Sequence, residues 1–193
     1  MNNAIVLHGV EENYEEYMQT LKERGSEIHL HWYPWIQNQL LQLGILAQTP
    51  EMPAPYFTDM NYADWEKIIN GFDINENTVL IGHSAGGGFW VEYLSKHPDI
   101  KVKQLIMVAP WLDPNGETKG FYNFEFDKTL SDRVGKMDIF YSTDDMDMII
   151  KSAEKIITNY PKTEIHKFKD KGHFTLSCLG GREFPELLES VIK

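Results

Sequence analysis

The chain has 193 residues, a formal net charge of −11 and a pI near 5.0. Hydrophobic residues make up 42% and charged residues 24%, which is typical of a globular protein and argues against wholesale disorder. The acidic balance disfavours a nucleic-acid partner, because phosphate binding needs clustered Lys and Arg. The single cysteine, Cys178, excludes an internal disulfide and favours a reducing compartment. With no signal-peptide pattern and no apolar stretch of the roughly 20 residues that span a bilayer, we expect a cytoplasmic protein without membrane association.

Short apolar segments alternate with amphipathic segments along the chain. Buried strands are predicted over residues 4–7, 78–81, 105–108 and 139–141, and weaker strands, nearer the sheet edges, over 45–47 and 163–168. Helices are predicted over residues 34–43, 61–69, 85–94 and 148–160, and from Pro185 onward. This alternation predicts one α/β domain over residues 1–193, with a mostly parallel sheet and helices on both faces.

Two segments do not fit the alternation. Residues 11–24 are strongly acidic and predict a short surface helix. Residues 111–127 are rich in aromatic side chains and are interrupted by Pro114, Gly116 and Gly120, which predicts a loop or a cap.

Residues 82–86, Gly-His-Ser-Ala-Gly, fit the pattern G-x-S-x-G between a predicted buried strand and a predicted helix. A serine on such a sharp strand-to-helix turn has a strained backbone and projects its hydroxyl from the end of the sheet. The turn also places the serine at a helix N-terminus, where a developing negative charge is stabilised. The sequence therefore predicts that Ser84 is a nucleophile.

An oxyanion hole requires two N–H groups that converge on one oxygen. We expect one from Ala85, the residue after the nucleophile, and the other from Val10, which follows His8 and Gly9 at the end of the first predicted strand. A simple strand-to-loop turn at Gly9 is the alternative. His8 itself is expected to pack and brace the loop rather than to react.

A serine hydroxyl needs a base, and the base needs an orienting acid that precedes it in the chain. His97, His166 and His173 follow Ser84. His97 ends the helix after the nucleophile and His166 lies within a predicted strand, which leaves His173, in the loop after that strand, as the expected base.

The acid should follow the predicted strand at 139–141, where Asp144, Asp145 and Asp147 all stand. The residues alone do not show which aspartate is the acid, since one is expected to orient the base and another to cap the next helix. A calcium site is not expected, because the segment lacks the glycine turn and the bidentate glutamate of a calcium loop.

The chain resembles the small serine hydrolases of the retinoblastoma-binding-protein and YdeN-like family, a reduced branch of the α/β-hydrolase superfamily. The matching stretches are His8-Gly9, residues 32–35 (Trp-Tyr-Pro-Trp), 82–86, 142–145 (Ser-Thr-Asp-Asp), 172–174 (Gly-His-Phe) and 184–187 (Phe-Pro-Glu-Leu). The resemblance implies a compact sheet of about six strands and assigns the acid to the second aspartate of the pair, Asp145. The chain departs from the family at Met146, where proline is common, and in a longer segment between Gly9 and Trp32.

A nucleophile, base, acid and oxyanion hole together predict a serine hydrolase that attacks an ester-like acyl substrate and passes through an acyl-enzyme. No cofactor and no metal are expected for this chemistry. An apolar acyl pocket is expected from aromatic side chains, although aromatic residues are more often core than pocket. The expected lining residues are Trp32, Trp35, Trp111, Phe121 and Tyr122.

Two other functions stay open: a non-catalytic binding or scaffold protein on the same fold, and an acyltransferase or perhydrolase that uses the same site. Protein partners are not indicated by the sequence.

Overall fold

The computed structural model describes residues 2–192, and within them six strands form one sheet in which every neighbouring pair is parallel. The strands are β1 (Asn3–Leu7), β2 (Leu46–Gln48), β3 (Thr78–His83), β4 (Val102–Val108), β5 (Val134–Ser142) and β6 (Glu164–Phe168). Their order across the sheet is β2-β1-β3-β4-β5-β6. The predicted α/β class, the parallel sheet and its size are confirmed.

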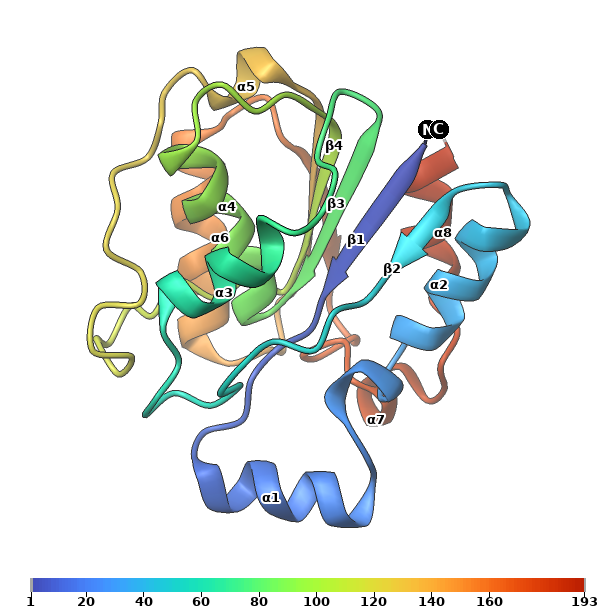
Figure 1. The fold of residues 1–193 in the computed structure, drawn as a ribbon. Coiled ribbons are helices and arrows are strands. Elements are labelled where there is room, and N and C mark those ends of the chain that lie inside the picture. The colour runs from blue at the N-terminus through green and yellow to red at the C-terminus, as the bar shows by residue number, and fades with distance from the viewer. Residues whose placement is uncertain (1, 193) are drawn as a thin grey trace.

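Helices cover both faces of the sheet (Figure 1). One face carries α2 (Tyr33–Gln42) and α8 (Pro185–Ile192), and the opposite face carries α3 (Tyr62–Ile69), α4 (Ala85–Lys96) and α6 (Asp147–Asn159). The α1 helix (Tyr14–Glu23) lies apart from both layers, beyond the carboxyl ends of the strands (Figure 1). Loops that follow β1, β3, β5 and β6 meet at this edge, where open parallel sheets bind their ligands.

Burial explains why the central strands could be predicted from the sequence. All residues of β1 and β3 are buried, as expected for strands that are covered on both faces. The edge strands are less buried, since β2 has one buried residue and β6 has none, so their sequence pattern is weaker. The two weaker strand predictions therefore fall at the two sheet edges, as expected.

The two irregular segments adopt different structures. Within residues 11–24 the α1 helix forms, capped by the Asn13 side chain, which accepts from the Glu16 N–H at 3.0 Å. Residues 111–127 contain neither helix nor strand. Three short elements were not predicted, because one helical turn has too few residues to show a period: η1 (Glu27–His29), α5 (Leu130–Arg133) and α7 (Leu176–Leu179). No helix between residues 2 and 192 is both long enough and apolar enough to cross a bilayer.

Candidate active site

Ser84 joins the end of β3 to the start of α4 in a strained conformation. Its φ is 52° and its ψ is −119°, a region that non-glycine residues occupy at a cost of about 1–3 kcal/mol. Its backbone is fixed on both sides: the Ser84 N–H donates to the Val108 carbonyl at 2.9 Å, and the Ser84 carbonyl accepts from the Trp111 N–H at 3.0 Å. This is the turn that the sequence predicted for a nucleophile.

The glycines on either side of Ser84 let the strand and the helix pass very close together. A Cβ on Gly82 would lie 2.4 Å from the Gly86 carbonyl oxygen, and a Cβ on Gly86 would lie 2.7 Å from the His8 carbonyl oxygen. Neither distance is physically tolerable, so both positions require glycine. The motif therefore holds the Ser84 backbone against the end of β1.

The Asp145 carboxylate hydrogen-bonds to the His173 ring. Nδ1 of His173 lies 2.9 Å from Asp145 Oδ2 and 3.2 Å from Oδ1. The Asp145 side chain is only 1% exposed, whereas the His173 side chain is 20% exposed and lines the same cavity as Ser84. A carboxylate at Nδ1 keeps the proton on that nitrogen and leaves Nε2 as the free base. Among the hydrogen bonds of residues 2–192 none joins Ser84 Oγ to His173, and such bonds often tighten only when substrate binds.

Asp144, the alternative acid, does not contact the imidazole. Its carboxylate accepts from the Ser142 hydroxyl and from the Gly172 N–H, the latter at 3.1 Å. The Ser142 hydrogen bond holds the pKa of Asp144 below its usual value. Asp144 thus ties the turn after β5 to the loop that carries His173. Phe174, fully buried and stacked on Phe184 with ring centroids 5.4 Å apart, anchors the other side of that loop.

The Gly9–Val10 backbone runs directly beside Ser84. A Cβ on Gly9 would lie 3.1 Å from Ser84 Cβ and 3.7 Å from Ser84 Oγ. Neither the Val10 N–H nor the Ala85 N–H has a protein acceptor within residues 2–192, so both donors are available to a ligand. His8 braces this loop: its Nε2 accepts from the Met52 N–H at 3.0 Å, and burial lowers its pKa.

A buried hydrogen-bond chain crosses the site from the Gly9 loop to the His173 loop. The Gly9 N–H donates to the Tyr33 hydroxyl at 3.3 Å, and this hydroxyl lies 2.6 Å from His83 Nδ1. His83 Nε2 lies 2.8 Å from the His173 carbonyl oxygen. A carbonyl only accepts, so His83 carries its proton on Nε2 and accepts from Tyr33 at Nδ1. Burial holds the pKa of His83 well below its usual value, which keeps the ring neutral.

Ser84 and His173 share a cavity of about 200 Å³ whose walls are mostly polar. The lining residues are Gly9, Val10, Glu11, Arg24, Glu27, His31, Tyr33, His83, Ser84, His173 and Thr175. Residues 11–31, which include α1 and η1, supply four of the charged or ionisable members: Glu11, Arg24, Glu27 and His31. Residues 11–31 therefore form one wall of the candidate site.

Two groups in this wall have strongly shifted pKa values. Burial, with the neighbouring Glu11 carboxylate, raises the pKa of Glu27 to about 8. Burial lowers the pKa of His31 to about 4, and the ring accepts the Leu176 N–H at Nδ1, 3.0 Å away. Near neutral pH both side chains therefore favour their uncharged forms.

The five aromatic residues expected to form an acyl pocket do not line this cavity, which corrects that expectation. Trp32, Trp111 and Phe121 are buried in the core, and Trp35 packs partly buried against it. Trp111 stacks on Phe57 with centroids 4.4 Å apart, and the Tyr122 hydroxyl donates to the Ala85 carbonyl at 2.9 Å. The aromatic segment thus packs around the start of α4 rather than over Ser84, because its rings bury more apolar area against the core than a polar cavity offers.

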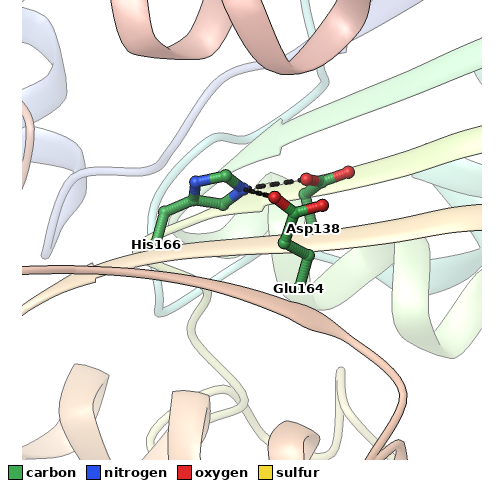
Figure 2. A group of neighbouring side chains, drawn as sticks. All are labelled: Asp138, Glu164 and His166. Atoms are coloured by element: carbon green, nitrogen blue, oxygen red, sulfur yellow. Dashed lines mark hydrogen bonds and ion pairs between the residues drawn. The ribbon is translucent and has the colours of Figure 1, made fainter. Parts of the chain in front are cut away.

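One group of side chains has the composition of a metal site and lies elsewhere in the sheet (Figure 2). Asp138, Glu164 and His166 place one potential ligand atom each within 4.8 Å of one another. The Lys136 ammonium already occupies this position, 3.0 Å from Asp138 Oδ1 and 3.2 Å from Glu164 Oε2. His166 Nε2 lies 2.8 Å from Asp138 Oδ1. We interpret the group as an ion-pair network that joins β5 and β6.

The polar wall of the cavity could not be predicted from the sequence. Glu27 and His31 flank Ile28 and Leu30 in a short segment with no motif and no helical period. Their places depend on η1 and on the positive φ of His31, 50°, which tertiary contacts fix. The one sequence feature that pointed to this wall was the longer segment inferred between Gly9 and Trp32 from the family resemblance.

Comparisons with known proteins identify the family and the fold of the chain. A family model described as serine hydrolase matches residues 23–190. The serine hydrolase RBBP9 of Rattus norvegicus is 26% identical over 176 residues, which cover 86% of this chain and 88% of that protein. The solved structure of the ydeN gene product of Bacillus subtilis matches with a TM-score of 0.78 at 19% identity, over 100% of this chain and 97% of that one.

A more distant likeness extends to a second solved structure. Est1E of Butyrivibrio proteoclasticus, solved with ferulic acid bound, matches with a TM-score of 0.61 at 13% identity, over 99% of this chain and 90% of that one. At such identities the structural matches show the fold, and the family model covers most of the chain. The chain belongs to the serine hydrolase family and has the α/β-hydrolase fold.

Proposed function

We propose that the chain hydrolyses carboxylic esters through a triad of Ser84, His173 and Asp145. The observation that carries this proposal is the 2.9 Å contact between His173 Nδ1 and Asp145 Oδ2, in a loop whose imidazole shares a cavity with Ser84. The likeness to Est1E, whose structure holds ferulic acid, is consistent with an acyl substrate.

In the first half-reaction, Ser84 Oγ attacks the ester carbonyl while His173 Nε2 takes the hydroxyl proton. Asp145 stabilises the imidazolium that forms and remains ionised itself. The carbonyl oxygen becomes an anion, and the free N–H groups of Val10 and Ala85 are the donors proposed to bind it. The tetrahedral intermediate collapses when the imidazolium donates its proton to the leaving alkoxide, which departs as the alcohol.

In the second half-reaction, His173 Nε2 removes a proton from water, which attacks the acyl-enzyme. The new tetrahedral intermediate collapses and Ser84 regains its proton from His173. The products are the carboxylic acid and free enzyme. Both half-reactions balance with the ester, water and the protein's own groups.

The test is turnover of a series of simple esters by purified wild-type protein and by Ser84→Ala. The proposal predicts measurable hydrolysis by the wild type and its loss in the folded Ala variant. The variant Ser177→Ala, at an exposed serine of α7, is the matched control and should retain activity. Undiminished turnover in Ser84→Ala would refute the assignment, and absence of turnover for every ester by folded wild type would favour a non-catalytic protein.

A further inference from the structure

His31 lines the cavity that holds Ser84, and its ring is held on three sides. Its Nδ1 accepts the Leu176 N–H, 3.0 Å away, which joins the turn before α2 to the start of α7. The ring also makes T-shaped contacts with Tyr33 and His83, with ring centroids 5.6 Å and 5.9 Å apart. The His31 side chain is only 12% exposed. These contacts fix the position of the remaining ring nitrogen, Nε2.

The backbone of His31 adopts an uncommon conformation. Its φ of 50° lies in the left-handed region, which few non-glycine residues occupy. Such conformations persist only where the surrounding structure fixes them, and they cluster at sites that bind ligands. The turn therefore holds the His31 side chain against the cavity at a cost in backbone conformation.

Nε2 of His31 is a hydrogen-bond donor without an acceptor. Because Nδ1 accepts from the Leu176 backbone, its lone pair is occupied and the single proton of the neutral ring is on Nε2. Glu27 Oε2 lies 3.9 Å from Nε2, which is beyond hydrogen-bond distance, and no oxygen between residues 2 and 192 accepts from it. Buried N–H groups normally have an acceptor, so this N–H is available to a substrate atom in the cavity.

The chemistry around Nε2 limits the kind of atom that it can bind. An N–H donor needs an acceptor, so an ammonium group cannot bind to it. The acidic side chains of Glu11 and Glu27 line the same wall and disfavour a negatively charged group. A neutral oxygen with a free lone pair, such as an ether, hydroxyl or carbonyl oxygen, meets both conditions.

We infer that His31 is a specificity residue whose Nε2–H binds a neutral oxygen of the substrate beyond the ester group, so that esters with such an oxygen are favoured over hydrocarbon esters of the same shape. The inference rests on the proposed ester hydrolysis at Ser84. The oxygen can belong to the acyl group or to the alcohol, since Ser84, proposed to receive the acyl group, and His173, proposed to protonate the alcohol, share the cavity. His31 itself takes no proton, because the Leu176 N–H occupies its Nδ1 lone pair.

The test compares pairs of esters in which an ether oxygen replaces one CH₂ group. In the acyl series, benzyl methoxyacetate is paired with benzyl butanoate, and benzyl 3-methoxypropanoate with benzyl pentanoate. In the alcohol series, 2-methoxyethyl acetate is paired with butyl acetate. Each kcat/KM is divided by the rate constant of that ester for alkaline hydrolysis, which removes differences in intrinsic reactivity. The corrected ratio of ether to hydrocarbon ester should reach about 5-fold or more in one of the two series for wild type, the factor for one net neutral hydrogen bond.

Two variants of His31 separate substrate binding from support of the turn. In His31→Asn, Oδ1 can replace Nδ1 as the acceptor of the Leu176 N–H, and Asn tolerates the positive φ, but its side chain is too short to place a donor at the Nε2 position. The corrected ratio should fall to about one in this variant, while kcat/KM for the hydrocarbon esters changes little. His31→Gln places an amide donor near the Nε2 position and should retain most of the ratio. His29→Asn, at an exposed histidine of η1, is the matched control and should leave the ratio unchanged.

A corrected ratio near one in both series for wild type, with the hydrocarbon esters turned over, would overturn the inference and leave the proposed function intact. An unchanged ratio in His31→Asn would overturn it as well. So would an equal loss in His31→Gln, because that result would trace the effect to the Leu176 contact and not to the donor. No turnover of any ester by folded wild type would instead contradict the proposed function.

Discussion

His83 Nε2 lies 2.8 Å from the carbonyl oxygen of His173, so the residue before Ser84 hydrogen-bonds to the backbone of the residue that we propose as the base. The same imidazole accepts from Tyr33, whose hydroxyl also accepts the Gly9 N–H. One buried chain of hydrogen bonds therefore sets the positions of the Gly9 loop and the His173 loop relative to β3.

Tyr33→Phe should weaken this chain at both of its inner contacts. It leaves the Gly9 N–H and His83 Nδ1 without partners, and we expect the free energy of unfolding to fall by about 1–3 kcal/mol. Because the Gly9 loop and the His173 loop are then no longer joined through Tyr33, kcat should fall by about 10-fold or more with little change in KM. Tyr14→Phe, at a tyrosine that is 50% exposed, is the control and should change neither quantity. Unfolding by urea and steady-state kinetics on one ester measure the two effects, and wild-type kcat in Tyr33→Phe would contradict the positioning role.

Asp145→Asn and Asp144→Asn should differ sharply. Asp145 contacts His173 Nδ1, and its replacement by Asn favours the wrong imidazole tautomer, so kcat should fall by about 10⁴ with the fold retained. Asp144 accepts from Ser142 and Gly172 and holds the loop, so Asp144→Asn should lower kcat by no more than about 10-fold. Parallel kinetics and thermal melting of the two variants measure this difference. Equal losses in both would show that Asp145 has no special role in orienting the imidazole.

Val10→Pro should remove one of the two N–H donors proposed for the oxyanion. The expected loss of kcat is about 10²–10³, the effect of deleting one such donor. Val10→Ala keeps the N–H and should retain nearly full activity, which separates the backbone donor from the side chain. Activity in Val10→Pro equal to that of Val10→Ala would exclude the Val10 N–H from the oxyanion hole.

The stability of the protein should depend on pH through Glu27. Burial and the Glu11 carboxylate raise its pKa in the folded state to about 8, from 4.5 in the unfolded chain. The folded state therefore binds more protons between these values, so this contribution to stability is full below about pH 4.5 and is lost as the pH rises through about 8.

Glu27→Gln removes this titration and leaves His31, whose pKa is shifted in the opposite direction, in both proteins. The difference in free energy of unfolding between wild type and variant should therefore shift steadily in favour of the variant from pH 5 to pH 8. Urea unfolding at several pH values measures it. If the free energy of unfolding varied with pH in the same way in both proteins, the raised pKa of the buried Glu27 carboxyl group would be contradicted.

Those parts of the candidate site that local geometry determines could be predicted from the sequence. Ser84 was predictable because an elbow between strand and helix demands small residues at fixed spacing, and the clashes at Gly82 and Gly86 explain that demand. His173 followed from chain order and from the predicted strand before it. Asp145 could not be separated from Asp144 by the residues alone; the family resemblance favoured it, and its contact with His173 Nδ1 agrees. The catalytic roles themselves stay predictions.

The parts that were missed depend on tertiary structure. Aromatic rings at 111–127 gave the same sequence signal whether they lined a pocket or packed in the core, and Trp111 proved to be buried. The burial of Glu27 could not be predicted, because an isolated glutamate is normally exposed. It depends on the packing of residues 11–31 beside β1 and α7. Loops and one-turn helices are too short or irregular to give a periodic pattern of apolar residues, so a site wall that they form cannot be predicted from such a pattern.

The most direct measurement of the central claim is covalent labelling of purified wild-type protein by an alkyl fluorophosphonate, followed by mass analysis of the intact chain and its peptides. We expect one adduct per chain, located on Ser84, with labelling abolished in Ser84→Ala and slowed strongly in Asp145→Asn. An adduct on another residue, or no adduct on folded wild type, would contradict Ser84 as an activated nucleophile.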